Sequence, residues 1–269
     1  MTIARAGVRI SRFSVAVLAA IGRGRFARDG IAGRAARLHA ACAEIAEIHN
    51  LKLGIRGAWP TSPVVIVANH ISYLDPIAIA AMLPCAPIAK SEVASWPVIG
   101  TAASELGVIF VKRDSMASRV SALRTALATL RAGVPVVNFP EGTTTNGTQL
   151  LPFQRGIFGL ARLAGVQILP VAVRCARELA WHGNAPFVPH YMSMARLPAP
   201  ELRLDLGQPI DPACFGSDEE VAALAYHRIA YMLRDQLENH APVIRLRVPP
   251  PRPDSVLSAA HRPLARRTH

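Results

Sequence analysis

The sequence predicts a single α/β domain with a mostly parallel central sheet covered by helices, preceded by a helical N-terminal segment. The chain has 269 residues, enough for one large domain with a buried core. From residue 51 onward, short apolar runs alternate with segments of helical periodicity, the order typical of α/β proteins. These runs are almost continuously apolar, as expected for strands buried on both faces of a parallel sheet.

Composition divides the chain into three parts: residues 1–50, 51–240 and 241–269. The formal charge of +12 lies mostly at the two ends. Residues 1–50 contain eight Arg against three acidic residues, and residues 241–269 contain six Arg against one. Nucleic acid and anionic lipid are the two phosphate-rich partners that such basic ends can bind. We favour lipid and expect no nucleic-acid partner, because no nucleic-acid-binding motif is present and aromatic residues make up only 6% of the chain.

Residues 3–23 predict an amphipathic helix. Arg5, Arg9, Arg12 and Arg23 fall on one face, and Ile3, Ile10, Phe13, Val17 and Ile21 fall on another. Such a helix is suited to lie in the interface of an anionic membrane. Two alternatives are a helix docked on the domain itself and a secretory signal, although the arginines that follow residue 22 disfavour export. A second helix is expected over 31–49. No stretch of 18 uncharged apolar residues occurs, so a conventional spanning helix is not supported.

The elements of the main domain are expected in a regular order. Apolar runs predict strands at 51–56, 64–68, 87–90, 107–111, 134–139 and 167–174, and alternation predicts an outer strand at 202–206. Helical periodicity predicts helices at 76–83, 96–106, 117–131, 156–164 and 217–237. Residues 175–199 are expected to be an irregular excursion. The tail from 241 is rich in Pro and Arg without periodicity, which predicts disorder.

Polar side chains follow three of the expected strands directly. His70 comes after the run 64–68, Arg113 after 107–111 and Glu141 after 134–139. Because the carboxyl ends of parallel strands meet at one edge of a sheet, we expect these residues to form one composite site.

His70 and Asp75 have the residue types of a general-base pair. A histidine can remove a proton from a hydroxyl at neutral pH, and a carboxylate on its other nitrogen holds the ring in place. The alternative is structural: Asp75 caps the helix that begins near Pro76, and His70 is a satisfied core residue. Taken alone, the spacing of the two residues favours the structural interpretation.

Arg113 and the segment 140–147 complete the set of strand-end residues. An arginine suits a phosphate through bidentate geometry, although a solvated pair with Asp114 is equally compatible with the sequence. Glu141 could accept hydrogen bonds from substrate hydroxyls or order the turn that it begins. No GxSxG motif places a nucleophile against His70, so a substrate hydroxyl is expected to attack directly.

Metal and redox chemistry are not expected. Cys42, Cys85, Cys175 and Cys214 lie far apart without paired spacing, which is typical of reduced thiols. No CxxC or HExxH pattern is present, so we predict no metal site.

Four motifs resemble those of the glycerolipid acyltransferase family, whose bacterial archetype is 1-acyl-glycerol-3-phosphate acyltransferase. Residues 69–75, Asn-His-Ile-Ser-Tyr-Leu-Asp, are similar to its NHxxxxD motif, and residues 107–113, Gly-Val-Ile-Phe-Val-Lys-Arg, to its second motif. Residues 139–143, Phe-Pro-Glu-Gly-Thr, resemble the third motif, and 168–171, Ile-Leu-Pro-Val, the fourth. The resemblance covers about residues 51–210.

The resemblance implies a function and roles for the motif residues. His70 would deprotonate the free hydroxyl of a lysolipid while Asp75 orients the ring, and the oxygen would attack a thioester of coenzyme A or acyl carrier protein. The resemblance further implies that Arg113 holds the acceptor's phosphate, that Glu141, Gly142 and Thr143 bind its glycerol part, and that backbone donors near Pro170 support the oxyanion. The acyl donor is then a co-substrate, and no bound cofactor is expected.

One position departs from the family pattern. Many phosphatidate-forming members have an arginine after EGT, whereas Thr144 occupies that place here. We expect 1-acylglycerol-3-phosphate as acceptor, with lyso-ornithine lipid or another lysophospholipid as the alternative and a non-catalytic lipid-binding protein as a further one. A peripheral or monotopic enzyme at the cytoplasmic face of the inner membrane is expected.

Overall fold

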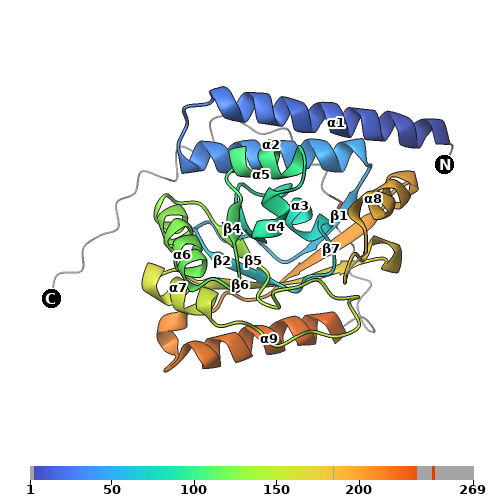
Figure 1. Ribbon diagram of the computed structural model, residues 1–269. Helices are drawn as coiled ribbons and strands as arrows, with labels where there is room; N and C mark the ends of the chain where they lie inside the picture. The colour runs from blue at the N-terminus through green and yellow to red at the C-terminus, as the bar shows by residue number, and fades with distance from the viewer. Residues whose placement is uncertain (1–2, 184, 235–243, 246–269) are drawn as a thin grey trace.

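The computed structural model describes residues 3–183, 185–234 and 244–245. Its centre is an eight-stranded sheet in the order β4-β3-β5-β2-β6-β7-β1-β8 (Figure 1). In this order the strands span Ile109–Val111, Ala86–Lys90, Val136–Asn138, Val65–Ala68, Ile168–Cys175, Glu201–Leu206, Lys52–Arg56 and Ile244–Arg245. The first five are parallel, β7 is antiparallel to β6 and parallel to β1, and β8 is antiparallel to β1. The predicted α/β fold with a mostly parallel sheet is confirmed.

Helices cover both faces of this sheet. They are α1 (Ile3–Phe26), α2 (Ile31–Ile48), α3 (Leu74–Ala80), α4 (Ser91–Ala94), α5 (Ile99–Glu105), α6 (Met116–Arg131), α7 (Gly156–Ala164), α8 (Phe187–Arg196) and α9 (Asp218–Arg234), with 3-10 turns at Arg177–Leu179 and Pro212–Cys214. In Figure 1, α1 and α2 lie along one side of the domain, and α7 and α9 lie on the opposite side.

Strand β2 shows why the sheet has two cores. All four of its residues are fully buried. Val65 and Val67 pack into a cluster with α6, α7 and α9, whereas Ile66 and Ala68 pack into a second cluster with α2, α3 and α8. Successive side chains of a strand point to opposite faces, so a continuous apolar run is needed where both faces are covered.

The predicted apolar face of α1 packs against the domain. The Phe13 ring centroid lies 4.9 Å from that of Tyr191 in α8, and Val17 is buried. The expectation that this face contacts a membrane was therefore wrong, and the alternative of docking on the domain describes it. Periodicity separates the two faces of a helix without specifying which one faces the protein.

The predicted basic face of α1 is also partly engaged. Arg9 donates hydrogen bonds to the backbone carbonyls of Leu197 at 2.5 Å and Pro198 at 3.0 Å, just beyond the end of α8. Arg23 forms an ion pair with Glu44 of α2 at 3.7 Å. Only part of the expected basic face is therefore turned to solvent.

A second, narrower apolar stripe of α1 faces outward. Val8, Val15, Leu18 and Phe26 are 58%, 66%, 57% and 86% exposed. Their spacing of seven, three and eight residues places them along one side of the helix. Among the described residues, no helix combines the length and apolarity that a membrane span requires.

Three predicted elements differ from the structure. Strand β7 lies between β6 and β1, so it is not an outer strand. The helix expected over 96–106 is shorter: α5 begins at Ile99, after Pro97, which has no backbone N–H, and the separate short helix α4 ends before it at Ala94. The excursion 175–199 contains α8, whose Pro189 lies in the first turn, where proline is tolerated.

The C-terminal predictions fall mostly outside the described residues. Helix α9 is described to Arg234, and the expected end near residue 237 lies beyond it. Of the predicted disordered tail, only β8 is described, and it pairs with β1.

Candidate active site

The three strand ends that carry His70, Arg113 and Glu141 open into one cavity of 980 Å³. Gly142, Thr143 and Thr144 also line this cavity. Strands β2 and β5 are parallel neighbours, so His70 and Glu141, which follow them, lie at the same edge of the sheet. Strand β3 is parallel to both β5 and β4, so Arg113, which follows β4, lies at that edge too. The predicted convergence of these residues therefore occurs, for the reason given by the sheet topology.

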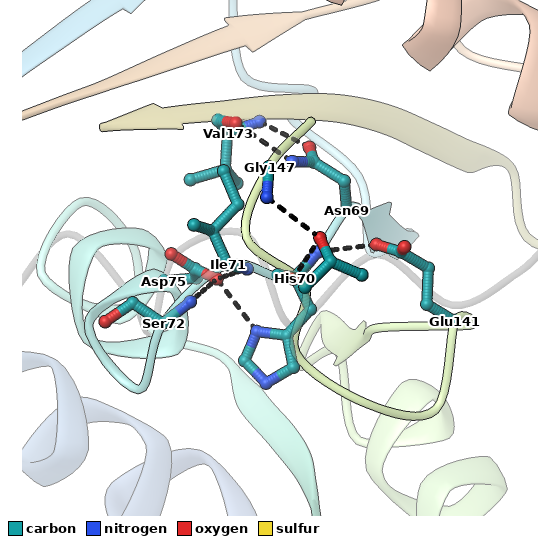
Figure 2. Close-up of polar contacts among 9 residues, drawn as sticks. Asn69, His70, Ile71, Ser72, Asp75, Glu141, Gly147 and Val173 are labelled. Carbon is teal, nitrogen blue, oxygen red and sulfur yellow. Dashed lines mark hydrogen bonds and ion pairs between the residues drawn. The ribbon is translucent and has the colours of Figure 1, made fainter. Parts of the chain in front are cut away.

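His70 and Asp75 are in direct contact. The Nδ1 atom of His70 lies 2.8 Å from Oδ2 of Asp75, and the Asp75 side chain is completely buried (Figure 2). A carboxylate can only accept a hydrogen bond, so Nδ1 carries the proton and Nε2 of the neutral ring is an acceptor. In Figure 2 the other ring nitrogen points away from Asp75. Among the described residues it forms no hydrogen bond, so it is available to a ligand in the cavity.

The Asp75 carboxylate is fixed by the loop that precedes α3. Its Oδ2 atom accepts hydrogen bonds from the backbone N–H groups of Ile71 at 2.7 Å and Ser72 at 2.8 Å. The N-cap position of α3 is Tyr73, which makes no side-chain capping bond. Asp75 therefore does not cap the helix in the expected sense. Its carboxylate reaches back to the loop and holds the His70 ring there.

Residues without a predicted role fix the His70 backbone and ring. The Phe139 ring stacks on His70 with centroids 4.1 Å apart and an interplanar angle of 20°. The Asn69 amide exchanges two hydrogen bonds with the backbone of Val173 in β6, at 2.7 and 3.0 Å. The Thr145 N–H donates to the His70 carbonyl at 2.8 Å. Asn69 and Phe139 are the first residues of the motifs at 69–75 and 139–143, and this membership is the sequence signal that indicates them.

Glu141 is bound to the backbone through both carboxylate oxygens. Oε1 accepts the His70 N–H at 2.7 Å, and Oε2 accepts the Leu151 N–H at 2.9 Å. Burial raises the pKa of Glu141, whereas these two N–H donors act in the opposite direction. The contacts match the alternative in which Glu141 orders the turn, and they tie that turn to His70.

Arg113 lies against Gly142. Gly142 has a φ of +78°, and a Cβ built there would be 3.9 Å from the Arg113 guanidinium carbon. Glycine adopts this left-handed conformation without strain and leaves space beside the cation. Partial burial lowers the pKa of Arg113, and the nearby Glu92 carboxylate opposes that shift. Arg113 is thus a cation at the cavity beside the Glu141 turn.

Pro170 is not brought to this site. It lies inside β6 opposite Val67, is buried and does not line the cavity. Its carbonyl accepts the Gly207 N–H at 2.8 Å. Within the described residues, no group of three or more His, Cys, Asp or Glu side chains could hold a metal ion.

Comparison with known proteins gives the family. A family model described as Acyltransferase matches residues 46–174. The lyso-ornithine lipid O-acyltransferase of Rhizobium meliloti is 31% identical over 198 residues, which are 66% of this chain and 68% of that protein. The chain belongs to the acyltransferase family. The relatives that match it are named as acyltransferases of lyso-ornithine lipid and of 1-acyl-sn-glycerol-3-phosphate.

Further relatives of this acyltransferase differ in their named acceptors. The 1-acyl-sn-glycerol-3-phosphate acyltransferase of Neisseria gonorrhoeae is 40% identical over 111 residues, 41% of this chain and 44% of that protein. The crystal structure of the 1-acyl-sn-glycerophosphate acyltransferase PlsC from Thermotoga maritima has a TM-score of 0.68 at 20% identity, covering 89% of this chain and 97% of that one. This structural likeness shows a shared fold.

Proposed function

We propose that this acyltransferase moves a fatty acyl group from an acyl thioester to the free hydroxyl of a lysolipid at the cytoplasmic face of a membrane. The observation that carries the proposal is the His70–Asp75 contact, with Nε2 of His70 available at the cavity. The thioester is acyl-CoA or acyl carrier protein, and the mechanism needs no bound cofactor.

The reaction is a direct transfer. Nε2 of His70 removes the proton of the acceptor hydroxyl as the oxygen attacks the thioester carbonyl. The C–O bond forms, the C–S bond breaks, and the departing thiolate takes the proton from the imidazolium. Asp75 holds the protonated Nδ1 and stabilises the positive ring. The stacked Phe139 ring keeps the imidazole in this orientation.

The other residues of the cavity bind the acceptor or position His70. Arg113 pairs with the anionic head group of the acceptor, and Gly142 and Thr143 line the wall beside it. Glu141 acts by positioning the His70 backbone, as its two N–H contacts indicate. We assign no role to Pro170.

The apolar part of the cavity suits a fatty acyl chain. It extends between α1, α2 and α3, where its lining includes Ala16, Val17, Ala20, Leu38, Ala41, Cys42, Leu74 and Ile77. Such a surface removes methylene groups from water at about 0.8 kcal/mol each.

Two acceptors are compatible with the site. We favour lyso-ornithine lipid, because Thr144 lacks the cation that the family's phosphatidate-forming members have there and because the relatives that match over 198 residues are named for that acceptor. The second candidate is 1-acylglycerol-3-phosphate, the expected acceptor, which is supported by the 40% identical relatives and by Arg113. Either head group offers an anion to Arg113.

The outward stripe of α1 supports membrane attachment. Its four exposed apolar side chains, together with exposed Arg12 beside them, suit the interface of an anionic bilayer. The proposed contact uses this stripe and not the inner apolar face.

A reconstituted assay tests the proposal. Purified enzyme is given lyso-ornithine lipid or 1-acylglycerol-3-phosphate, each with acyl-CoA or acyl carrier protein thioester, and product ester is measured. We expect transfer to lyso-ornithine lipid, and loss of transfer by folded His70→Ala. Absence of thioester consumption with every pair would favour a lipid-binding protein, and full activity of His70→Ala would exclude His70 as the base.

A further inference from the structure

The cavity has more cations than one acceptor head group requires. Lys90, Arg113, Arg119 and Arg155 all line it. Arg155 forms an ion pair with Glu219. In the described part of the chain, Lys90, Arg113 and Arg119 form no ion pair. If Arg113 binds the acceptor, the positive charge of Arg119 still lacks a counterion at the same cavity.

The chain places Arg119 at the outer rim, next to the end of β4. Strands β3 and β4 are parallel, and the Lys90–Val111 register brings their ends together. Past β4, the Lys112 N–H donates to Ser118 Oγ at 2.9 Å, which ties the first turn of α6 to the strand end. Arg119 follows directly, exposed, with its Nη2 atom 3.7 Å from Met116 Sδ.

Arg119 occupies an unfavourable place for a cation. It lies just inside the N-terminus of α6, where the helix dipole favours acidic side chains, and the first turn contains none. The helix dipole, Arg119 and Lys90 therefore all add positive potential to one rim of the cavity. A bound anion would balance this charge.

We infer that Arg119 binds the phosphate of the phosphopantetheine arm that carries the acyl thioester. The inference rests on the proposed function. This arm is common to coenzyme A and acyl carrier protein, and it is long enough to keep its phosphate at the solvent side while the thioester reaches His70. Arg113, which lies against Gly142 in the turn that Glu141 ties to His70, is left to the acceptor.

The test compares donors with and without this phosphate. Arg119→Ala is expected to raise KM about tenfold for both acyl-CoA and acyl carrier protein thioester, since a charge-assisted hydrogen bond to phosphate is lost. With acyl-N-acetylcysteamine, a truncated thioester without phosphate, KM should be the same for both enzymes. Acceptor KM should also stay constant. Arg124→Ala is the control, because Arg124 is exposed on the same helix and does not line the cavity.

Each other outcome overturns the inference. A KM that increases for acyl-CoA alone would assign Arg119 to the nucleotide part of coenzyme A. A KM that increases for the acyl carrier protein thioester alone would assign it to the surface of the carrier protein. An increased acceptor KM would place the acceptor head group at Arg119, and equal KM values throughout would leave it no role. If Arg119→Ala does not fold, Arg119→Gln makes the same comparison. Wild-type enzyme that transfers from no donor would refute the proposed function, whereas any of the outcomes above, seen with an active wild-type enzyme, refutes this inference alone.

Discussion

The Oδ2 atom of Asp75 lies 2.8 Å from Nδ1 of His70 and also accepts the backbone N–H groups of Ile71 and Ser72. One buried oxygen therefore fixes both the loop and the ring that it supports. The two N–H donors keep the carboxylate in place while the ring changes charge. A residue that only capped a helix would not be oriented towards the imidazole.

Asp75→Asn is expected to lower kcat by about 10²–10⁴-fold. The neutral amide cannot stabilise the imidazolium. Its NH₂ group would also face the Ile71 and Ser72 N–H groups, which need an acceptor. We expect KM for both substrates to change little, because Asp75 does not line the cavity. Steady-state kinetics with a circular dichroism spectrum checks this.

Asp114→Asn serves as the matched control, because Asp114 is an exposed aspartate that follows Arg113 in the sequence and does not line the cavity. Equal kcat values for wild type and Asp75→Asn would contradict the general-base pair.

Glu141→Gln is expected to lower kcat about tenfold or more with an unchanged acceptor KM. Both oxygens accept backbone N–H groups, and glutamine replaces one acceptor with a donor that faces an N–H. The change should therefore displace the His70 backbone and leave the head-group site unchanged. Kinetics at saturating donor with varied acceptor separates the two effects. A raised KM with constant kcat would instead assign Glu141 to direct contact with the acceptor.

Thr144→Arg should shift acceptor preference towards 1-acylglycerol-3-phosphate by about tenfold in the ratio of kcat/KM values. Thr144 lines the cavity, so an arginine there adds a second guanidinium near Arg113 for a doubly charged phosphate. The measurement is competition between the two acceptors in one assay. Thr148→Arg is the control, because Thr148 is exposed in the same loop and does not line the cavity. An equal shift in both variants would indicate a general charge effect.

The sequence predicted the convergence of His70, Arg113 and Glu141, because parallel strands end at a common edge and each residue directly follows a strand. It did not predict the hydrogen-bond partners of Glu141. The His70 N–H is 71 residues away and the Leu151 N–H lies in an irregular loop, so only the folded backbone brings them together. The inner face of α1 was assigned wrongly for a similar reason. Its periodicity defines two faces, whereas the surface that it covers comes from α2 and α8.

Acid should destabilise the protein through His49. This residue is 2% exposed, its ring contacts Tyr191 and Phe13, and burial, with a further contribution from Arg9, lowers its pKa to about 4. In the unfolded chain a histidine has its ordinary pKa near 6.5. Between these values the unfolded state binds more protons, so the free energy of unfolding falls as pH decreases from about 6.5 to about 4, by roughly 3 kcal/mol.

Urea unfolding at pH 7 and pH 4.5 measures this difference, with His49→Phe as the variant that cannot titrate. Between pH 7 and pH 4.5 the free energy of unfolding should decrease by about 2 kcal/mol or more less in His49→Phe than in the wild type, because the variant lacks the proton uptake of His49. His227→Phe is the control, since His227 is exposed on α9. Its pH dependence should equal that of the wild type. Equal pH dependence in His49→Phe and the wild type would show that other groups cause the acid sensitivity.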